Sequence, residues 1–144
     1  MKLTKKTIED EDVYFQNGVK KYVHSIDSDG GEYWKEYDKN NNEIHYKRSD
    51  GSEYWSEFDS NNNVIHFKNS RGFEYWREFD KNNNEIYSKD SDGFEYWSEY
   101  DSNNNRIYHK DSRGYETWSD DNPKNPNNID VEVDIEPFTF KKEK

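Results

Sequence analysis

One stretch of 21 residues recurs along the chain: Gly51-Ser-Glu-Tyr-Trp-Ser-Glu-Phe-Asp-Ser-Asn-Asn-Asn-Val-Ile-His-Phe-Lys-Asn-Ser-Arg71. The five tryptophans stand 21 residues apart, at Trp34, Trp55, Trp76, Trp97 and Trp118. Glycine and aspartate keep the same step, at Gly30, Gly51, Gly72, Gly93 and Gly114 and at Asp38, Asp59, Asp80 and Asp101. A fixed period of this length identifies a repeat protein, in which each unit is one supersecondary element.

Each unit contains two strand patterns joined by turns. Residues 53–58 are rich in aromatics, too short for a helix and bounded by Gly and Asn, which predicts a strand. Residues 59–63, Asp-Ser-Asn-Asn-Asn, can cap their own turn and accept left-handed backbone, so they predict a hairpin loop. Residues 64–68 return as the second strand, and Gly72 supplies the positive φ of the next turn. The sequence predicts an all-β fold: an antiparallel meander of tandem 21-residue β-hairpin repeats.

Residues 1–29 form an N-terminal segment and a degenerate capping repeat. The polar residues 1–12 are expected to be frayed, apart from those that the first strand recruits. The capping repeat matches the regular units at three positions: Val13 for Trp34, Asn17 for Asp38, and Val23-His24 for Ile44-His45.

The regular part, residues 30–118, holds four complete hairpins and the start of a fifth. Residues 119–144 comprise a Pro/Asn loop, a strand and a basic tail. The strand pattern, residues 129–135, alternates Ile or Val with acidic residues, and we expect it to cap the last hairpin and close the sheet edge.

Strand alternation assigns the side chains to two faces. If the loop comprises residues 60–63, Phe58 lies opposite Ile65, and the Tyr/Phe/Ile side becomes the packed face. The Glu-Trp-Glu side then lies opposite His66 and Lys68, where opposite charges are favourable neighbours. A loop longer by one residue would join Ile65 to the Trp side instead.

Composition limits the partners of the chain. The net charge is −11, and aromatics make up 17% of the residues while all hydrophobic types reach only 28%, so aromatic rings supply most of the apolar area. Disorder is disfavoured because a disordered chain would not keep tryptophan in register. Since an acidic chain repels nucleic acid and anionic lipid, we expect a basic partner, with no direct nucleic acid and no membrane.

Compartment and cofactors are predicted from what the sequence lacks. It has no cysteine, and the basic N-terminus is not followed by an apolar run, so we expect neither a secretory signal nor a membrane span and assign a cytoplasmic location. Asp38-Lys-Asn-Asn-Asn42 resembles the start of a calcium loop but lacks its later ligands, so turn capping is the favoured role.

The histidines in one column, His24, His45 and His66, are about 9.6 Å apart per hairpin and cannot converge on zinc, so we expect them to pair with Glu. The carboxylate pairs recur in every hairpin, whereas an active site is singular. No catalytic residue, metal or cofactor is predicted, and the protein is interpreted as a non-enzyme.

The pairs Tyr37-Asp38, Phe58-Asp59, Phe79-Asp80 and Tyr100-Asp101, each with a Gly thirteen positions after the Asp, resemble the YD repeat of bacterial Rhs-type proteins. The spacing of Gly, Trp and Tyr is also similar to the MORN-like hairpin repeats of an antitoxin family. Two departures are that Asn41 and its equivalents replace the turn glycine and that Ile44 and its equivalents come one position late. The resemblance implies a hairpin fold, and four or five such repeats are too few for the closed container of an Rhs shell.

The tryptophan ladder has two interpretations. Its members either pack in the interior or between layers, or form an exposed strip that binds basic side chains through charge and cation–π contact. The candidate partner-binding residues are Glu32, Trp34, Glu36, Glu53, Trp55, Glu57, Glu74, Trp76, Glu78, Glu95, Trp97 and Glu99.

Our leading hypothesis is an acidic inhibitor that occupies the basic, nucleic-acid-binding groove of a partner such as a nuclease. An antitoxin, an immunity protein or a phage anti-CRISPR inhibitor would act in this way. The alternatives are a repeat module that binds glycans on its aromatic strip, and a homo-oligomeric structural repeat protein, for example a homodimer.

Overall fold

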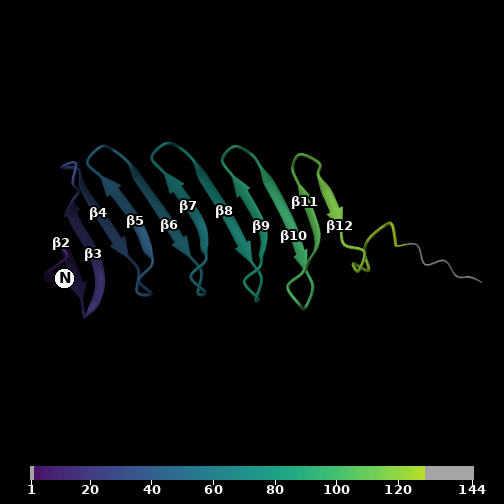
Figure 1. The fold of residues 1–144 in the computed structure, drawn as a ribbon, viewed down its shortest axis with the longest axis horizontal. Coiled ribbons are helices and arrows are strands. Elements are labelled where there is room, and N and C mark those ends of the chain that lie inside the picture. Colours follow the sequence, from purple (N-terminus) through teal and green to yellow (C-terminus); the bar gives the residue numbers. More distant parts are fainter. Residues whose placement is uncertain (1, 129–144) are drawn as a thin grey trace, which may run out of the picture.

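The computed structural model describes residues 2–128 as one antiparallel sheet of 12 strands in sequence order (Figure 1). The predicted all-β meander of hairpin repeats is confirmed. The bounds are β1 Thr4–Ile8, β2 Glu11–Gln16, β3 Val19–Ile26, β4 Glu32–Tyr37, β5 Glu43–Arg48, β6 Glu53–Phe58, β7 Val64–Asn69, β8 Glu74–Phe79, β9 Glu85–Asp90, β10 Glu95–Tyr100, β11 Arg106–Asp111 and β12 Glu116–Trp118. Within these residues no helix is long and apolar enough to cross a membrane.

Both margins of the regular sheet are built from three-residue loops. In the Asn loops, at the lower margin of Figure 1, the Asn62 N–H bonds the Asp59 carbonyl at 3.2 Å and the Asp59 N–H bonds the Asn63 carbonyl at 3.0 Å. Asn62 has a φ of 67°, in the left-handed region. At the upper margin Gly51 takes the same role with a φ of 91°. This pattern is a type I turn followed by a left-handed residue.

The register differs from the expectation at one point. Phe58 pairs with Val64, not with Ile65, because the loop is one residue shorter than expected. A bulge at Ile65 then adds one residue to the returning strand, so that Glu57 pairs with His66 and Trp55 with Lys68. The short loop and the bulge compensate each other. The predicted neighbours of the Glu-Trp-Glu side are therefore confirmed.

The expectation that residues 1–12 are frayed is wrong. Residues 4–8 form β1, which pairs along its whole length with β2 through a two-residue turn at Glu9-Asp10. Both turn residues have positive φ, 49° and 67°, as a type I′ turn requires. Backbone pairing orders this polar segment although all of its side chains are exposed.

Val13 does not take the position of Trp34. Asn17 and Gly18, both with positive φ, form a two-residue turn that replaces the three-residue loop of the regular units. The shorter turn shifts the alternation, so Val13 points to the opposite face and Asp12 enters the row of His24 and Trp34. His24 keeps the place of His45, since it pairs with Trp34 as His45 pairs with Trp55.

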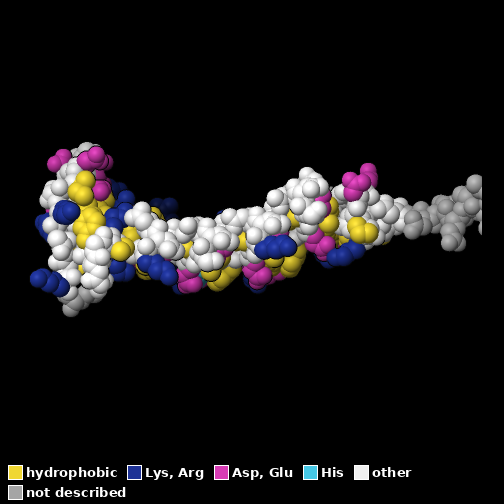
Figure 2. Space-filling model, turned by 90° about the horizontal axis from the view of Figure 1, so that it is seen from below, with side chains coloured by type: hydrophobic (Ala, Val, Ile, Leu, Met, Phe, Trp, Pro, Cys, Tyr) yellow, Lys and Arg dark blue, Asp and Glu magenta, His cyan; other side chains and the backbone are white. Residues whose placement is uncertain are grey.

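The sheet is a single layer with little interior. Val13, Val23 and Tyr37 are the buried hydrophobic residues, and all three lie near the N-terminal end. Figure 2 shows the molecule from below as a slab that is thin along the regular hairpins and broader at the β1–β3 end. Within residues 2–128 no second layer covers either face, so every regular hairpin presents both of its faces.

A coil of asparagine turns follows β12. Asn122 and Asn125 are buried, at 1% and 5% exposed, although both are polar. Their side-chain amides donate to the carbonyls of Ile107 and Ser119, and each also accepts a main-chain N–H two residues later. Asparagine at every third position thus builds a self-capped coil at this end of the sheet. The expected C-terminal strand, residues 129–135, lies outside the described residues.

Candidate binding face

The twelve predicted site residues lie on one face of the sheet, here called the Trp face. The opposite face, here called the Tyr face, carries Val13, Val23, Tyr33, Tyr37, Tyr46, Tyr54, Phe67, Tyr75 and Tyr96. The exposed fractions of Trp34, Trp55, Trp76 and Trp97 are 41%, 40%, 38% and 38%. Packing between layers is therefore wrong for these four tryptophans within residues 2–128, and their predicted exposure is confirmed.

Side chains on the Trp face form rows across five strands. One row runs through Glu57, His66, Trp76, Lys89 and Glu95, each paired with the next across a strand boundary. Each hairpin contains a bulge, which shifts the pairing along the strands. The next row of the same kind therefore begins one hairpin further along the sheet. Trp34, Trp55, Trp76 and Trp97 thus each have an aromatic neighbour on one side and lysine on the other.

The aromatic neighbours stack on the tryptophans. The ring centroids of His45 and Trp55 are 5.2 Å apart with an interplanar angle of 9°, and those of His66 and Trp76 are 5.2 Å apart at 10°. The contact is tilted where tyrosine replaces histidine, with 39° between Tyr87 and Trp97. Stacking contributes about 0.5–1.5 kcal/mol per pair beyond burial. The stacked ring covers one side of each indole, while the tryptophan stays partly exposed to solvent.

The first glutamate of each unit is engaged within the face. His45 Nε2 contacts Glu53 at 2.8 Å, His66 Nε2 contacts Glu74 at 2.8 Å, and Lys89 Nζ contacts Glu95 at 2.6 Å. The expected pairing of histidine with glutamate is confirmed for His45 and His66, whereas His24 Nε2 lies 3.9 Å from Glu32. These carboxylates are already partnered, so a ligand would have to compete for them.

The second glutamate of each unit differs between units in its partner and its exposure. Glu36 pairs with Lys21 and Glu99 with Lys124, whereas the side chain of Glu57 is 69% exposed beside His66. Glu78 is exposed and makes no ion pair within residues 2–128. Glu57 and Glu78 are therefore the carboxylates that this face offers most openly.

His66 has the most acidic surroundings on the Trp face. Its ring nitrogens contact Glu57 at 3.2 Å and Glu74 at 2.8 Å. Burial opposes protonation, but the two carboxylates outweigh it and raise the pKa of His66 above 6.5. The His66 ring stacks on Trp76 with a carboxylate on each side.

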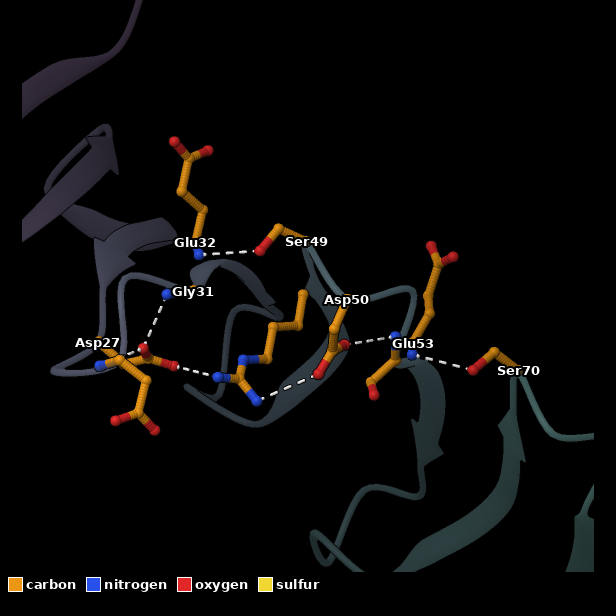
Figure 3. Close-up of polar contacts among 10 residues, drawn as sticks. Asp27, Gly31, Glu32, Ser49, Asp50, Glu53 and Ser70 are labelled. Atoms are coloured by element: carbon orange, nitrogen blue, oxygen red, sulfur yellow. Dashed lines mark hydrogen bonds and ion pairs between the residues drawn. The ribbon is translucent and has the colours of Figure 1, made fainter.

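The margins hold the rows in register. At the upper margin the Ser49 and Ser70 hydroxyls accept the main-chain N–H of Glu32 and Glu53 at 3.1 Å (Figure 3). Arg48 bridges two successive turns there through Asp27 at 2.6 Å and Asp50 at 3.1 Å. These contacts fix the first glutamate of each unit relative to the hairpin that follows.

At the lower margin an asparagine ladder joins the Asn loops. The Asn42 amide donates both to Asp38, at 3.0 Å, and to the Asn62 side-chain carbonyl of the next loop, at 2.8 Å. The same contact recurs between Asn63 and Asn83 at 2.7 Å. Asp38 also accepts two main-chain N–H groups, which confirms that it caps its turn. Burial works against ionisation, but these hydrogen bonds lower the pKa of Asp38.

On the Tyr face, tyrosine hydroxyls bond to carboxylates. Tyr54 donates to Glu43 and Tyr96 to Glu85 across the strands, while Tyr37 donates to Glu43 at 3.4 Å. Burial, followed by these carboxylates, raises the pKa of Tyr37 to about 12 and that of Tyr96 to about 12, and the pKa of Tyr54 is also raised. The sequence analysis did not predict these hydrogen bonds. Their signal in the sequence was glutamate at positions 43 and 85, on strands next to those that carry the tyrosines.

The Trp face has a smaller concavity around Trp34 and a larger one around Trp97. The larger one has a volume of about 790 Å³, is open to solvent and lies across β8–β11. Its lining includes Glu78, Tyr87, Trp97, Glu99 and Tyr108. The two carboxylates and three aromatic rings give it the chemical character of a site for an organic cation.

Metal binding and relatives give no further assignment. No three side chains of His, Asp or Glu within residues 2–128 are grouped closely enough to hold a metal ion. No protein-family model matches the chain, and no curated protein matches it.

Proposed function

We propose that this protein is a non-enzymatic repeat module whose Trp face binds the basic surface of a partner protein. Four tryptophans in line, each close to 40% exposed, are the observation that supports this proposal. They form a strip that advances about 9.6 Å per hairpin. A partner groove lined with lysine and arginine fits it, because such side chains stack on open indoles and pair with exposed carboxylates.

The partner's groove is one that otherwise holds nucleic acid. The chain has a net charge of −11, which steers a cationic surface toward it. An inhibitor of a nuclease, acting as an antitoxin, an immunity protein or a blocker of a nuclease-based defence, would use this surface. Because the first glutamates are paired internally, Glu57 and Glu78 carry the charge contacts and the tryptophans carry most of the buried area.

The test uses an oligoarginine peptide as a defined basic probe. Isothermal titration at about 0.05 M and about 0.5 M salt should show binding that weakens strongly at the higher concentration. The double variant Glu57→Gln/Glu78→Gln should bind several-fold more weakly. The control Asp120→Asn/Asp121→Asn removes the same charge from the coil after β12 and should bind like the wild type. If both double variants weakened binding equally, net charge alone would explain the effect. That result would contradict a role for the Trp face.

Glycan binding is a second candidate, favoured by the internal pairing of Glu53, Glu74 and Glu95. With these carboxylates neutralised, the indoles remain as flat platforms against which sugar rings stack. A neutral oligosaccharide would then bind equally well at low and high salt, and its affinity would be unchanged in Glu57→Gln/Glu78→Gln.

A further inference from the structure

Within the Trp face, the hairpins β8–β9 and β10–β11 have tyrosine where the preceding hairpins have histidine. In β7, His66 stands between Glu57 and Trp76. In β9 the same place, between Glu78 and Trp97, is taken by Tyr87. An imidazole therefore contacts Glu57 at 3.2 Å, whereas Glu78 has no partner within residues 2–128.

The missing imidazole coincides with the concavity over β8–β11. Glu78 and Glu99 stand in its lining together with the rings of Tyr87, Trp97 and Tyr108. Carboxylates supply charge, while the negative faces of aromatic rings attract an ammonium or guanidinium group. A volume of about 790 Å³ accommodates a lysine or arginine side chain with part of the segment that bears it.

The chain itself brings a lysine to the rim of this concavity. Lys124, in the coil after β12, places Nζ 2.9 Å and 3.2 Å from the two oxygens of Glu99. Its side chain remains 65% exposed, so the contact is superficial. An ammonium group therefore already uses the Glu99 carboxylate, whereas the Glu78 carboxylate is open.

We propose that the concavity around Trp97 is the primary acceptor site of the Trp face and takes a lysine or arginine side chain of a basic partner segment. This inference rests on the proposed function and names where on the face the contact begins. Glu78 supplies the unpaired charge and Trp97 the stacking surface. Lys124 competes for Glu99 and weakens the site until a partner displaces it.

The experiment follows the indole N–H resonances of the five tryptophans by NMR while oligoarginine is added. The Trp97 resonance should shift first and furthest. Glu78→Gln should weaken binding about fivefold, the effect of one partly desolvated charge pair. The matched control Asp120→Asn removes an exposed carboxylate from the coil after β12 and should weaken binding less than twofold. Glu57→Gln, whose carboxylate already contacts His66, should weaken binding less than Glu78→Gln. Trp97→Ala should weaken it about tenfold, and Trp55→Ala clearly less.

The outcomes separate this inference from the proposed function. Salt-sensitive binding with equal shifts at Trp34, Trp55, Trp76 and Trp97 would overturn the acceptor site and leave the Trp face as a uniform binding surface. No shift at any tryptophan would overturn both. Lys124→Ala should tighten binding about threefold because Glu99 becomes available, and weaker binding in that variant would overturn the competition by Lys124.

Discussion

The two faces of the sheet are made from the same alternating strands but differ in how much they leave open. On the Tyr face, hydroxyls bond to carboxylates, rings stack across strands, and Ser56 and Ser98 are 8% and 5% exposed. On the Trp face the indoles of Trp55 and Trp97 remain 40% and 38% exposed. The difference shows that one face of a single-layer sheet can be tied by hydrogen bonds and ring stacking while the other keeps a row of exposed indoles.

The largest effect should come from the Tyr face near its small core. Tyr37 is 9% exposed and packs with Val13 and Val23. Its ring centroid lies 3.4 Å from Lys20 Nζ. Tyr37→Ala should lower the free energy of unfolding by about 3 kcal/mol in urea titrations. Trp55→Ala should cost about 1 kcal/mol, mainly from the lost stack on His45. A larger loss of stability in Trp55→Ala than in Tyr37→Ala would contradict the assignment of stability to the Tyr face.

The separation of the faces depends on loops that fix the register, since a slip of one residue exchanges the faces. Asn62 has a φ of 67° and accepts the amide of Asn42. Asn62→Ala should cost about 1–2 kcal/mol in urea unfolding, because alanine is strained in this region and the ladder contact is lost.

Two variants of the same loop sharpen this prediction. Asn62→Gly should cost less than the alanine variant, because glycine adopts positive φ without strain. Asn61→Ala, whose side chain makes no hydrogen bond within the described residues, should stay within about 0.5 kcal/mol of the wild type. Equal losses at Asn61 and Asn62 would contradict the assigned turn.

Alkaline pH should act on the Tyr face. The folded pKa values of Tyr37 and Tyr96, each about 12, exceed the unfolded value of about 10. The folded state therefore holds protons that the unfolded state releases, and stability is complete below about pH 10 and lost as the pH rises toward about 12. Melting temperatures across this range should fall, with a loss on the order of 1 kcal/mol after solvent screening.

Substitutions of tyrosine identify the groups responsible. Tyr54→Phe, which removes the hydroxyl bonded to Glu43, should flatten the alkaline slope. Tyr75→Phe serves as the control, because the Tyr75 hydroxyl makes no hydrogen bond within residues 2–128. An unchanged dependence of stability on alkaline pH in Tyr54→Phe would contradict a contribution from the Tyr54–Glu43 hydrogen bond.

Neutral pH should act on the Trp face, with the smallest effect. The pKa of His66 is raised above 6.5, so its contribution is complete below about pH 6.5 and is lost as the pH rises through the higher folded value. The loss should be a few tenths of a kcal/mol, visible as a small decrease in melting temperature between mildly acidic and mildly basic buffer. His66→Gln should abolish this decrease, and its persistence would contradict the assignment to His66.

Sequence reasoning found most of the fold and part of the face. Glycine and asparagine at positive φ, with aromatic strands between them, determined the repeat. The bulge at Ile65 could not be found, because a shorter loop with a bulge and a longer loop without one give the same neighbours for Glu57 and His66. The N-terminal register was misjudged since the two-residue turn at Asn17-Gly18 was matched to a three-residue loop.

The exposure of the tryptophans was left open for a physical reason. An alternating strand shows which residues share a face but not whether another layer covers that face. The buried asparagine coil was missed although its signal, Asn122, Asn125 and Asn128 at every third position, is in the sequence. A polar segment that satisfies its own backbone resembles an ordinary loop in composition.

Acrylamide quenching of tryptophan fluorescence tests the central claim most directly, namely that the Trp face is open in solution. The full chain should be quenched to a substantial fraction of the level measured for the same chain in concentrated urea, as side chains close to 40% exposed require. The result should not depend on protein concentration. Quenching far below the urea reference at every concentration would contradict the account, because the tryptophans would then be covered.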